Sequence, residues 1–214
     1  QDFRRELNMK EGWLSRTFKA TLQNGIEVEV NAKRFLSLNQ DEMGVINYQV
    51  TPLNSDAEIV FQPYIDSGIT NEDTNWDDKF WDTTQVSHDN NQAFIQAKTM
   101  KTDFYTCTFM ESKVFINGKS VLIEPNVSAD ATIVSYSYKK NVKQGETYAI
   151  HKFGGYTVDR NHDKNALVTA AKSVLATATQ LGFDTLLEQQ KQAWANIWDM
   201  ADITISGDVK AQQG

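Results

Sequence analysis

The sequence has little of what marks several functional classes. Its single cysteine, Cys107, cannot form an intramolecular disulfide. There is no apolar run of membrane-spanning length, and no apolar segment follows a basic start as in an export signal. The formal net charge is −7, with no cluster of Lys and Arg. These absences argue against a disulfide scaffold, a membrane protein and a nucleic-acid partner, and they favour a cytoplasmic location.

Motifs for metal or nucleotide chemistry are equally sparse. His88, His151 and His162 are scattered without metal-ligand spacing. The segment 118–120 is similar to the end of a phosphate-binding loop, but the upstream glycine that such a loop needs is replaced by Lys113. An Asn-Gly hairpin turn explains this segment better. We therefore expect no metal site.

What the sequence does contain, over its first three quarters, is alternation of apolar and polar residues. Such alternation is typical of half-buried strands, and the pair Asn24-Gly25 suits a tight hairpin turn. Similar runs follow, separated by turn residues. The expected strands comprise residues 14–22, 26–32, 35–38, 46–50, 59–64, 93–99, 104–110, 114–116, 121–123, 133–138 and 148–158. Their spacing predicts a mostly β fold over residues 1–160, an antiparallel sandwich.

The strand pattern lapses between residues 65 and 91, where the chain carries GITNEDTNWDDKFWD. Oxygen-bearing side chains stand there at the offsets of a calcium loop, but Trp76 replaces the required glycine and the last position is Asp82 rather than Glu. A solvated acidic loop is the favoured interpretation. The aromatic residues predict that the loop packs on something. The calcium-like positions are Asn71, Asp73, Asn75, Asp77 and Asp82.

Helical periodicity replaces the strand pattern in the last quarter, residues 161–214. One apolar stripe runs from Leu167 to Leu181 and stops at Gly182, a residue that often ends helices. A second stripe, from 186 to 201, places two indoles on one side of a helix, and this side must be covered. Strand-like alternation follows at 203–206. The residues that need cover are Trp194, Ile197 and Trp198.

Several of these runs together resemble the N-terminal domain of family 65 glycoside phosphorylases. The runs 7–18, 33–37 and 50–54 are similar to consecutive strands of that family's β-supersandwich, and the paired-Trp helix with the step 207–213 is similar to its exit toward a helical catalytic barrel. The resemblance implies an antiparallel β-supersandwich followed by two linker helices. It also implies that earlier strands and an (α/α)6 barrel lie outside this chain.

The loop carries the resemblance further, because its run from Asn71 to Asp82 is similar to a segment of the maltose phosphorylases of this family. The resemblance implies a place at the sugar-site rim or at a subunit contact, since exposed indoles stack on sugars and anchor interfaces. Packing of the aromatic residues on their own sheet is the alternative. The candidate rim or interface residues are Trp76, Asp78, Phe80 and Trp81. Trp194, Ile197 and Trp198 are expected to dock on the barrel.

The resemblance implies an inverting phosphorolysis of an α-glucoside such as maltose, with inorganic phosphate as co-substrate and no organic cofactor. Because the family's general acid is a Glu of the barrel, we assign no catalytic residue here and expect this chain alone to be inactive. One alternative is a free-standing carbohydrate-binding β-sandwich that uses Trp76 and Trp81. Another is the same domain of a family 65 hydrolase, and a homodimer is compatible with each.

Overall fold

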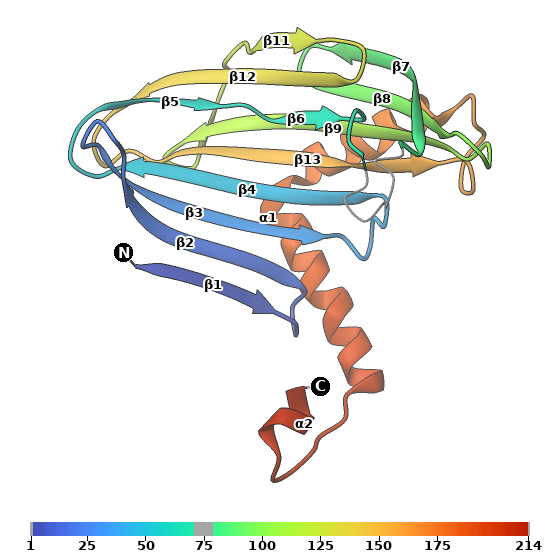
Figure 1. Cartoon of the computed structure of the whole chain (residues 1–214). Coiled ribbons are helices and arrows are strands. Elements are labelled where there is room, and N and C mark those ends of the chain that lie inside the picture. Colours follow the sequence, from blue (N-terminus) through green and yellow to red (C-terminus); the bar gives the residue numbers. More distant parts are fainter. Residues whose placement is uncertain (1, 71–78, 214) are drawn as a thin grey trace.

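The computed structural model describes residues 2–70 and 79–213, and strands dominate it (Figure 1). All of the described strands precede a long helix, which is followed by a short one. The elements are β1 (Phe3–Asn8), β2 (Trp13–Thr21), β3 (Glu27–Leu36), β4 (Met43–Pro52), β5 (Ala57–Phe61), β6 (Tyr64–Asp66), β7 (Trp81–Asp89), β8 (Gln92–Thr99), β9 (Tyr105–Ile116), β10 (Lys119–Val121), β11 (Asn126–Ala129), β12 (Ile133–Val142), β13 (Tyr148–Val158), α1 (Leu167–Ala201) and α2 (Val209–Gln213).

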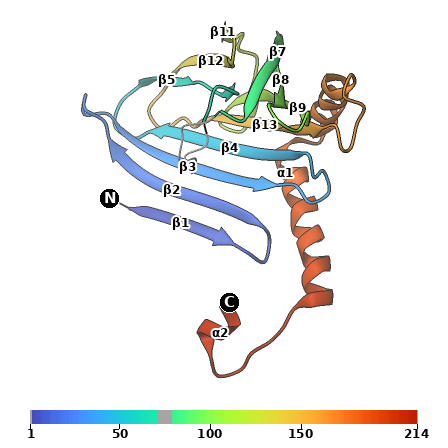
Figure 2. The ribbon, with the colours of Figure 1, turned by 45° about the vertical axis from the view of Figure 1, so that its right-hand side comes forward.

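Two antiparallel sheets form the sandwich. The large sheet has nine strands in the order β1-β2-β3-β4-β13-β9-β8-β7, with β10 paired to β9. The small sheet has four, in the order β11-β12-β5 with β6 also paired to β12. Both views show the small sheet over one part of the large sheet, while β1 to β3 extend past it (Figures 1 and 2). The sequence-based prediction of a mostly β, antiparallel sandwich fold is confirmed.

One apolar core lies between the two sheets. It is built by inward-facing residues of both, because alternate side chains of a strand point to opposite faces. Tyr136 of β12 is fully buried in it, as is Tyr148 of β13. We call this side of the large sheet its inner face. The core residues are Phe61, Ile65, Ala93, Ile95, Met110, Val114, Val134, Tyr136, Tyr138, Val142, Tyr148 and Ile150.

A second core lies on the outer face of the large sheet, under α1. The first segment of α1 contributes four buried residues of the stripe expected from the sequence: Leu167, Ala171, Leu175 and Ala178. They pack on outward-facing residues of the strands, among them Phe109 and other apolar side chains of the same core. The centre of the molecule therefore has three layers: small sheet, large sheet and helix.

The helix breaks where the sequence predicts. Gly182 has φ 76° and ψ 169°, which are not helical values, so α1 consists of two segments joined at this residue. Asp163 does not cap the first segment, which starts at Leu167; its carboxylate accepts from the Asn165 amide in a turn before the helix. None of the helices that the structure describes is long and apolar enough to cross a membrane.

Other sequence expectations for individual elements were wrong. The segment 65–91 was expected to lack strands. In the structure, the last two residues of β6 and the whole of β7 lie within it. The strands predicted at 104–110 and 114–116 are one strand, β9, and residues 35 and 36 continue β3. Residues 203–205 form no strand, because no partner strand lies beside them in the described part of the chain. The domain boundary at residue 160 stays a prediction.

Candidate functional site

The second segment of α1 meets the sandwich at the turn between β1 and β2. Gln190, 2% exposed, occupies this junction. Its amide Nε2 donates to the Gly12 carbonyl at 3.1 Å, and its Oε1 accepts from the Leu38 amide at 2.9 Å. One buried side chain thus joins the helix to two separate loops, which fixes the direction in which α1 leaves the sheet.

Gly12 makes this close approach possible. Its φ of +68° lies in the left-handed region, and a Cβ placed there would stand 1.8 Å from Nε1 of Trp194. Only glycine combines that backbone conformation with the absence of a side chain. The ring of Trp194 therefore lies against the turn backbone, and its Nε1 is buried without a hydrogen-bond partner among the described residues.

Trp198 lies one turn further along the helix. Its indole stacks on that of Trp194 with ring centroids 5.8 Å apart, and its Nε1 donates to the Lys10 carbonyl at 3.0 Å. Both indoles are half-buried by the β1–β2 turn, whereas Ile197 is 37% exposed. Trp194 and Trp198, two of the three predicted docking residues, are thus partly buried by this chain itself. Docking on a barrel stays a prediction for all three.

Apolar exposure increases past the indoles. Met200 is 82% exposed, Ile203 73% and Val209 85%. Figures 1 and 2 show this part of α1 and the following α2 projecting beyond the edge of the large sheet. Several strongly exposed apolar side chains on one projecting segment are a feature of interaction sites.

The candidate rim residues divide between described and undescribed positions. Trp76 and Asp78 lie outside the described residues, as do four of the five calcium-like positions. Phe80 is 39% exposed, and its carbonyl accepts from the Met100 amide at 2.9 Å. Trp81 begins β7 with its ring centroid 6.2 Å from that of Phe104. Trp81 thus contacts its own sheet, and a rim role for these residues stays a prediction.

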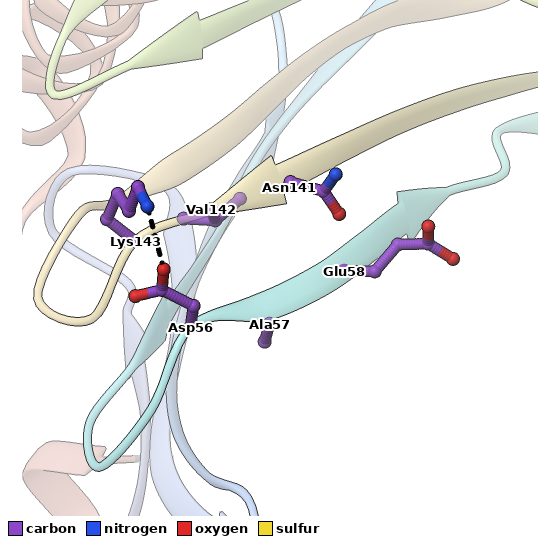
Figure 3. Close-up of a pocket in the computed structure, with 6 residues that line it drawn as sticks. All are labelled: Asp56, Ala57, Glu58, Asn141, Val142 and Lys143. Carbon is purple, nitrogen blue, oxygen red and sulfur yellow. Dashed lines mark hydrogen bonds and ion pairs between the residues drawn. The ribbon is translucent and has the colours of Figure 1, made fainter.

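A depression of about 310 Å³ lies at one end of β5 and β12 (Figure 3). Asp56 and Glu58 line it, and each carboxylate is paired: Asp56 with Lys143 at 2.9 Å, and Glu58 with Lys139 at 2.8 Å. Hydrogen bonds from the Gln144 amide and from Lys143 lower the pKa of Asp56. Both carboxylates thus have structural ion-pair partners, and we assign no catalytic role to this depression.

Two further carboxylates away from this depression have structural partners. Glu111, buried in β9, accepts from Gln92 Nε2 at 2.7 Å, and Glu42 pairs with His162 at 2.7 Å. Cys107 is fully buried, and desolvation raises its pKa to about 12, so its thiol is unreactive near neutral pH. Within the described ranges, no three acidic, His or Cys side chains gather as metal ligands would.

The surroundings of His151 strongly lower its pKa. Its ring lies on the outer face between Phe115 and Phe183, with ring centroids 4.2 Å and 5.3 Å away. Burial lowers its pKa to about 4, and the Asp184 carboxylate acts in the opposite direction. The imidazole is therefore neutral near pH 7 and serves as part of the packing under α1.

Sequence reasoning missed the two residues that build the junction. A signal for Gln190 was present, because it stands four residues before Trp194 and three after Leu187 on the apolar stripe of the helix. A polar residue on such a stripe suggests a buried hydrogen-bonding role. Gly12 carried no comparable signal, because its contact is with a residue far away in sequence.

The sequence of this chain is similar to one family profile and to several known proteins. The profile of the glycosyl hydrolase family 65, N-terminal domain, matches residues 1–197. Maltose phosphorylase of Bacillus subtilis (strain 168) is 31% identical over 212 residues, which are 99% of this chain and 27% of that protein. Alpha,alpha-trehalose phosphorylase of Thermoanaerobacter brockii is 28% identical over 221 residues, with 99% of this chain and 28% of the relative covered.

A solved structure described as a kojibiose phosphorylase from the human microbiome has the same fold, with a TM-score of 0.85 at 20% sequence identity. The match covers 100% of this chain and 27% of that one. The chain thus spans about 27% of the length of these relatives. Because the family profile covers most of the chain and the sandwich with its outer helix is shared, this chain belongs to glycosyl hydrolase family 65 and corresponds to its N-terminal domain.

Proposed function

We propose that this chain is the non-catalytic N-terminal domain of an inverting α-glucoside phosphorylase. The whole enzyme would convert maltose and inorganic phosphate into β-glucose 1-phosphate and glucose, in the cytoplasm and without an organic cofactor. A phosphate oxygen would attack the anomeric carbon while a carboxylic acid of a helical barrel gives its proton to the departing sugar oxygen. The names of the relatives support the reaction class, and the Bacillus subtilis relative supports maltose as substrate.

The observation that carries this proposal is the projecting apolar segment of α1. Ile197 and Met200 are exposed on a helix whose direction is fixed by buried Gln190. A rigid helix with an apolar outer surface is suited to hold a second domain at a set orientation, and we assign that surface to a catalytic barrel in the same polypeptide. The domain's contribution would be to support the barrel and its active-site rim.

The activity test compares the isolated 214-residue chain with the full-length protein. We expect phosphate-dependent release of glucose from maltose by the full-length protein only, because the proposal assigns the general acid to a barrel outside these 214 residues. Phosphorolysis by the isolated chain would overturn the non-catalytic role. Release of glucose by the full-length protein without phosphate would identify a hydrolase instead.

The docking test uses Ile197→Asp in the full-length protein, with Asn196→Asp as matched control. Both variants add one charge to the same turn of α1, but only Ile197 belongs to the apolar surface. A carboxylate buried at a domain contact costs several kcal/mol, so we expect Ile197→Asp to lower thermal stability and activity together. Equal effects of the two variants would count against docking through this surface.

A further inference from the structure

The chain has two Asn-Gly pairs, at 24–25 and 117–118, and both form exposed hairpin turns. The first connects β2 to β3, and the second connects β9 to β10. The β2–β3 turn lies at the end of the sandwich remote from the projecting half of α1 (Figure 1). Asn-Gly is a labile sequence, because glycine has no Cβ that hinders attack of its amide nitrogen on the asparagine side chain. The reaction of such a pair in a folded protein depends on how the asparagine is held.

The side chain of Asn24 is held within its own turn. Its Oδ1 accepts from the Ile26 amide at 3.2 Å, an exposed bond between residues two positions apart. A bond of this kind directs the asparagine side chain toward the main chain of the residue that follows it. A Cβ built on Gly25 would have nothing within 4 Å, so the attacking residue has open space around it. The Gly25 amide donates to the Leu22 carbonyl at 2.9 Å, and this bond inside the same loop must open before the reaction.

The side chain of Asn117 is bound to a different hairpin. Its Oδ1 accepts from the Thr147 amide at 2.9 Å, across 30 positions of sequence, and its own amide donates to the Thr147 carbonyl at 2.9 Å. The φ values of Asn117 and Gly118 are +48° and +76°, as in a tight two-residue turn. Movement of the Asn117 side chain toward the Gly118 nitrogen would therefore leave the Thr147 amide without its partner.

We propose that Asn24 is a site of spontaneous deamidation in the folded protein, and that Thr147 protects Asn117 from the same reaction. The Gly25 nitrogen forms a bond to Cγ of Asn24, and the bond from Cγ to Nδ2 breaks. The proton of the Gly25 amide leaves with Nδ2 as ammonia, and the main chain closes into a succinimide. Water then opens this ring at either carbonyl and gives aspartate or isoaspartate, with no oxidation or reduction.

The isoaspartate product changes the turn more than the aspartate product does. Its main chain passes through the former side chain of Asn24 and is longer by a carbon atom. The Leu22 amide, which donates to the Ile26 carbonyl at 2.8 Å across this turn, then loses its alignment. We expect both products to keep the sandwich and the junction of α1, because the modified turn lies at the other end of the sheet (Figure 1).

The test incubates the full-length protein in mildly alkaline buffer and follows both sites by peptide mapping with mass spectrometry. Replacement of the amide NH2 by OH raises the peptide mass, and aspartate and isoaspartate peptides separate by chromatography. We expect Asn24 to react at least about threefold faster than Asn117, a factor that one hydrogen bond of ordinary net strength can provide. The same protein unfolded in urea is the control. There the two rates should agree within about twofold, because the folded contacts are lost.

Two variants assign the difference to particular atoms. Gly25→Ala should slow the reaction at Asn24 at least about fivefold and leave Asn117 unchanged, because the added Cβ hinders the attack. Thr147→Pro lacks the N–H that binds Oδ1 of Asn117, so it should raise the rate at Asn117 at least about threefold. Circular dichroism checks that each variant is folded. If Thr147→Pro does not fold, the comparison of folded and urea-unfolded parent protein still decides.

Three results would contradict the proposal. Equal rates at the two sites of the folded protein, or a faster reaction at Asn117, would remove the preference for Asn24. A preference for Asn24 that persists in urea would show that the local sequence selects the site, not the contact with Thr147. A folded Thr147→Pro variant with an unchanged rate at Asn117 would likewise exclude that protection.

Discussion

Gln190 is the residue on which the direction of α1 depends. In Gln190→Ala the Leu38 amide and the Gly12 carbonyl each lose their side-chain partner in a buried site. Leaving buried polar groups unpaired costs about 1–3 kcal/mol, so we expect a loss of about 2–3 kcal/mol in the free energy of unfolding, measured with urea. Exposed Gln192→Ala is the control, and it should cost less than about 0.5 kcal/mol. Equal losses of unfolding free energy in the two variants would mean that the hydrogen bonds of Gln190 do not hold α1 in place.

Gly12 tests the contact between the turn and the indole. Gly12→Ala places a methyl group on a residue at φ +68°, directly against Trp194. Gly25→Ala is matched in backbone strain, because Gly25 has φ +80° but nothing within 4 Å. We expect each to cost about 1–2 kcal/mol from the left-handed backbone, and Gly12→Ala at least about 1 kcal/mol more from the clash.

Fluorescence provides a second readout for this pair. Gly12→Ala should shift tryptophan emission to longer wavelength, because the Trp194 ring must leave the turn and enter water. Gly25→Ala should leave the emission unchanged. If the two variants are equally stable and have equal spectra, the close approach at Gly12 does not exist in solution.

His151 makes stability depend on pH. Its folded pKa of about 4 lies below its ordinary value of 6.5, so the unfolded chain takes up a proton at a pH where the folded chain does not. Stability is therefore complete above pH 6.5 and falls as pH decreases toward 4. Allowing for partial solvent exposure, the loss is about 1–2 kcal/mol.

The measurement is the urea midpoint at pH 7.5 and pH 5 in the parent chain and in His151→Phe, which fits between Phe115 and Phe183. The variant should lose less stability between these two pH values than the parent does. The exposed His88→Phe serves as control and should retain the pH dependence of the parent. Parallel curves for all three proteins would contradict a neutral, buried His151.

At the scale of elements, Gly182 separates the segment of α1 that belongs to the core from the segment that leaves it. Its φ of 76° and ψ of 169° lie in a region that essentially only glycine occupies. Gly182→Ala should therefore destabilise the chain by about 1–3 kcal/mol, although it adds a residue that favours helices. Urea unfolding measures this loss. A gain in stability would show that the two segments can form one continuous helix.

The elements could be predicted where apolar and polar residues follow a regular period along the sequence, and not where that period is interrupted. The hairpin β2–β3 and the helix break at Gly182 were read correctly, because period-two and period-three-to-four patterns were unbroken there. Strand β7 was missed because a register shift between Thr83 and Gln85 interrupts its alternation. Strand β9 was predicted as two strands because Glu111 and the polar residues after it interrupt the apolar pattern. The sequence did not show that Glu111 is buried and accepts a hydrogen bond from a side chain of β8.

The candidate site was less predictable than the fold. The sequence could show that Trp194, Ile197 and Trp198 share a side of a helix, but not that the β1–β2 turn covers the two indoles in part. That cover depends on contacts between residues nearly 200 positions apart, such as Lys10 and Trp198. Local patterns carry no information about such pairs. Trp76 and Asp78 lie outside the described residues, so their predicted role is unchanged.

At the scale of the whole molecule, the centre has three layers, which are the small sheet, the large sheet and the first segment of α1. The second segment of α1 extends beyond these layers. The first segment of α1 covers the outer face of the large sheet, and the small sheet covers much of the inner face. The projecting part of α1 carries exposed apolar residues, Ile197 and Met200 among them. Under the proposed function, a barrel in the same polypeptide covers this part of the helix.

The central claim is that the projecting half of α1 rests against a domain outside these 214 residues. Amide hydrogen exchange of residues 191–201, compared between the isolated chain and the full-length protein, tests it most directly. Packing against a second domain should slow exchange in the full-length protein at least about tenfold, whereas in the isolated chain this segment should open easily. Equal exchange rates in the two proteins would contradict the claim.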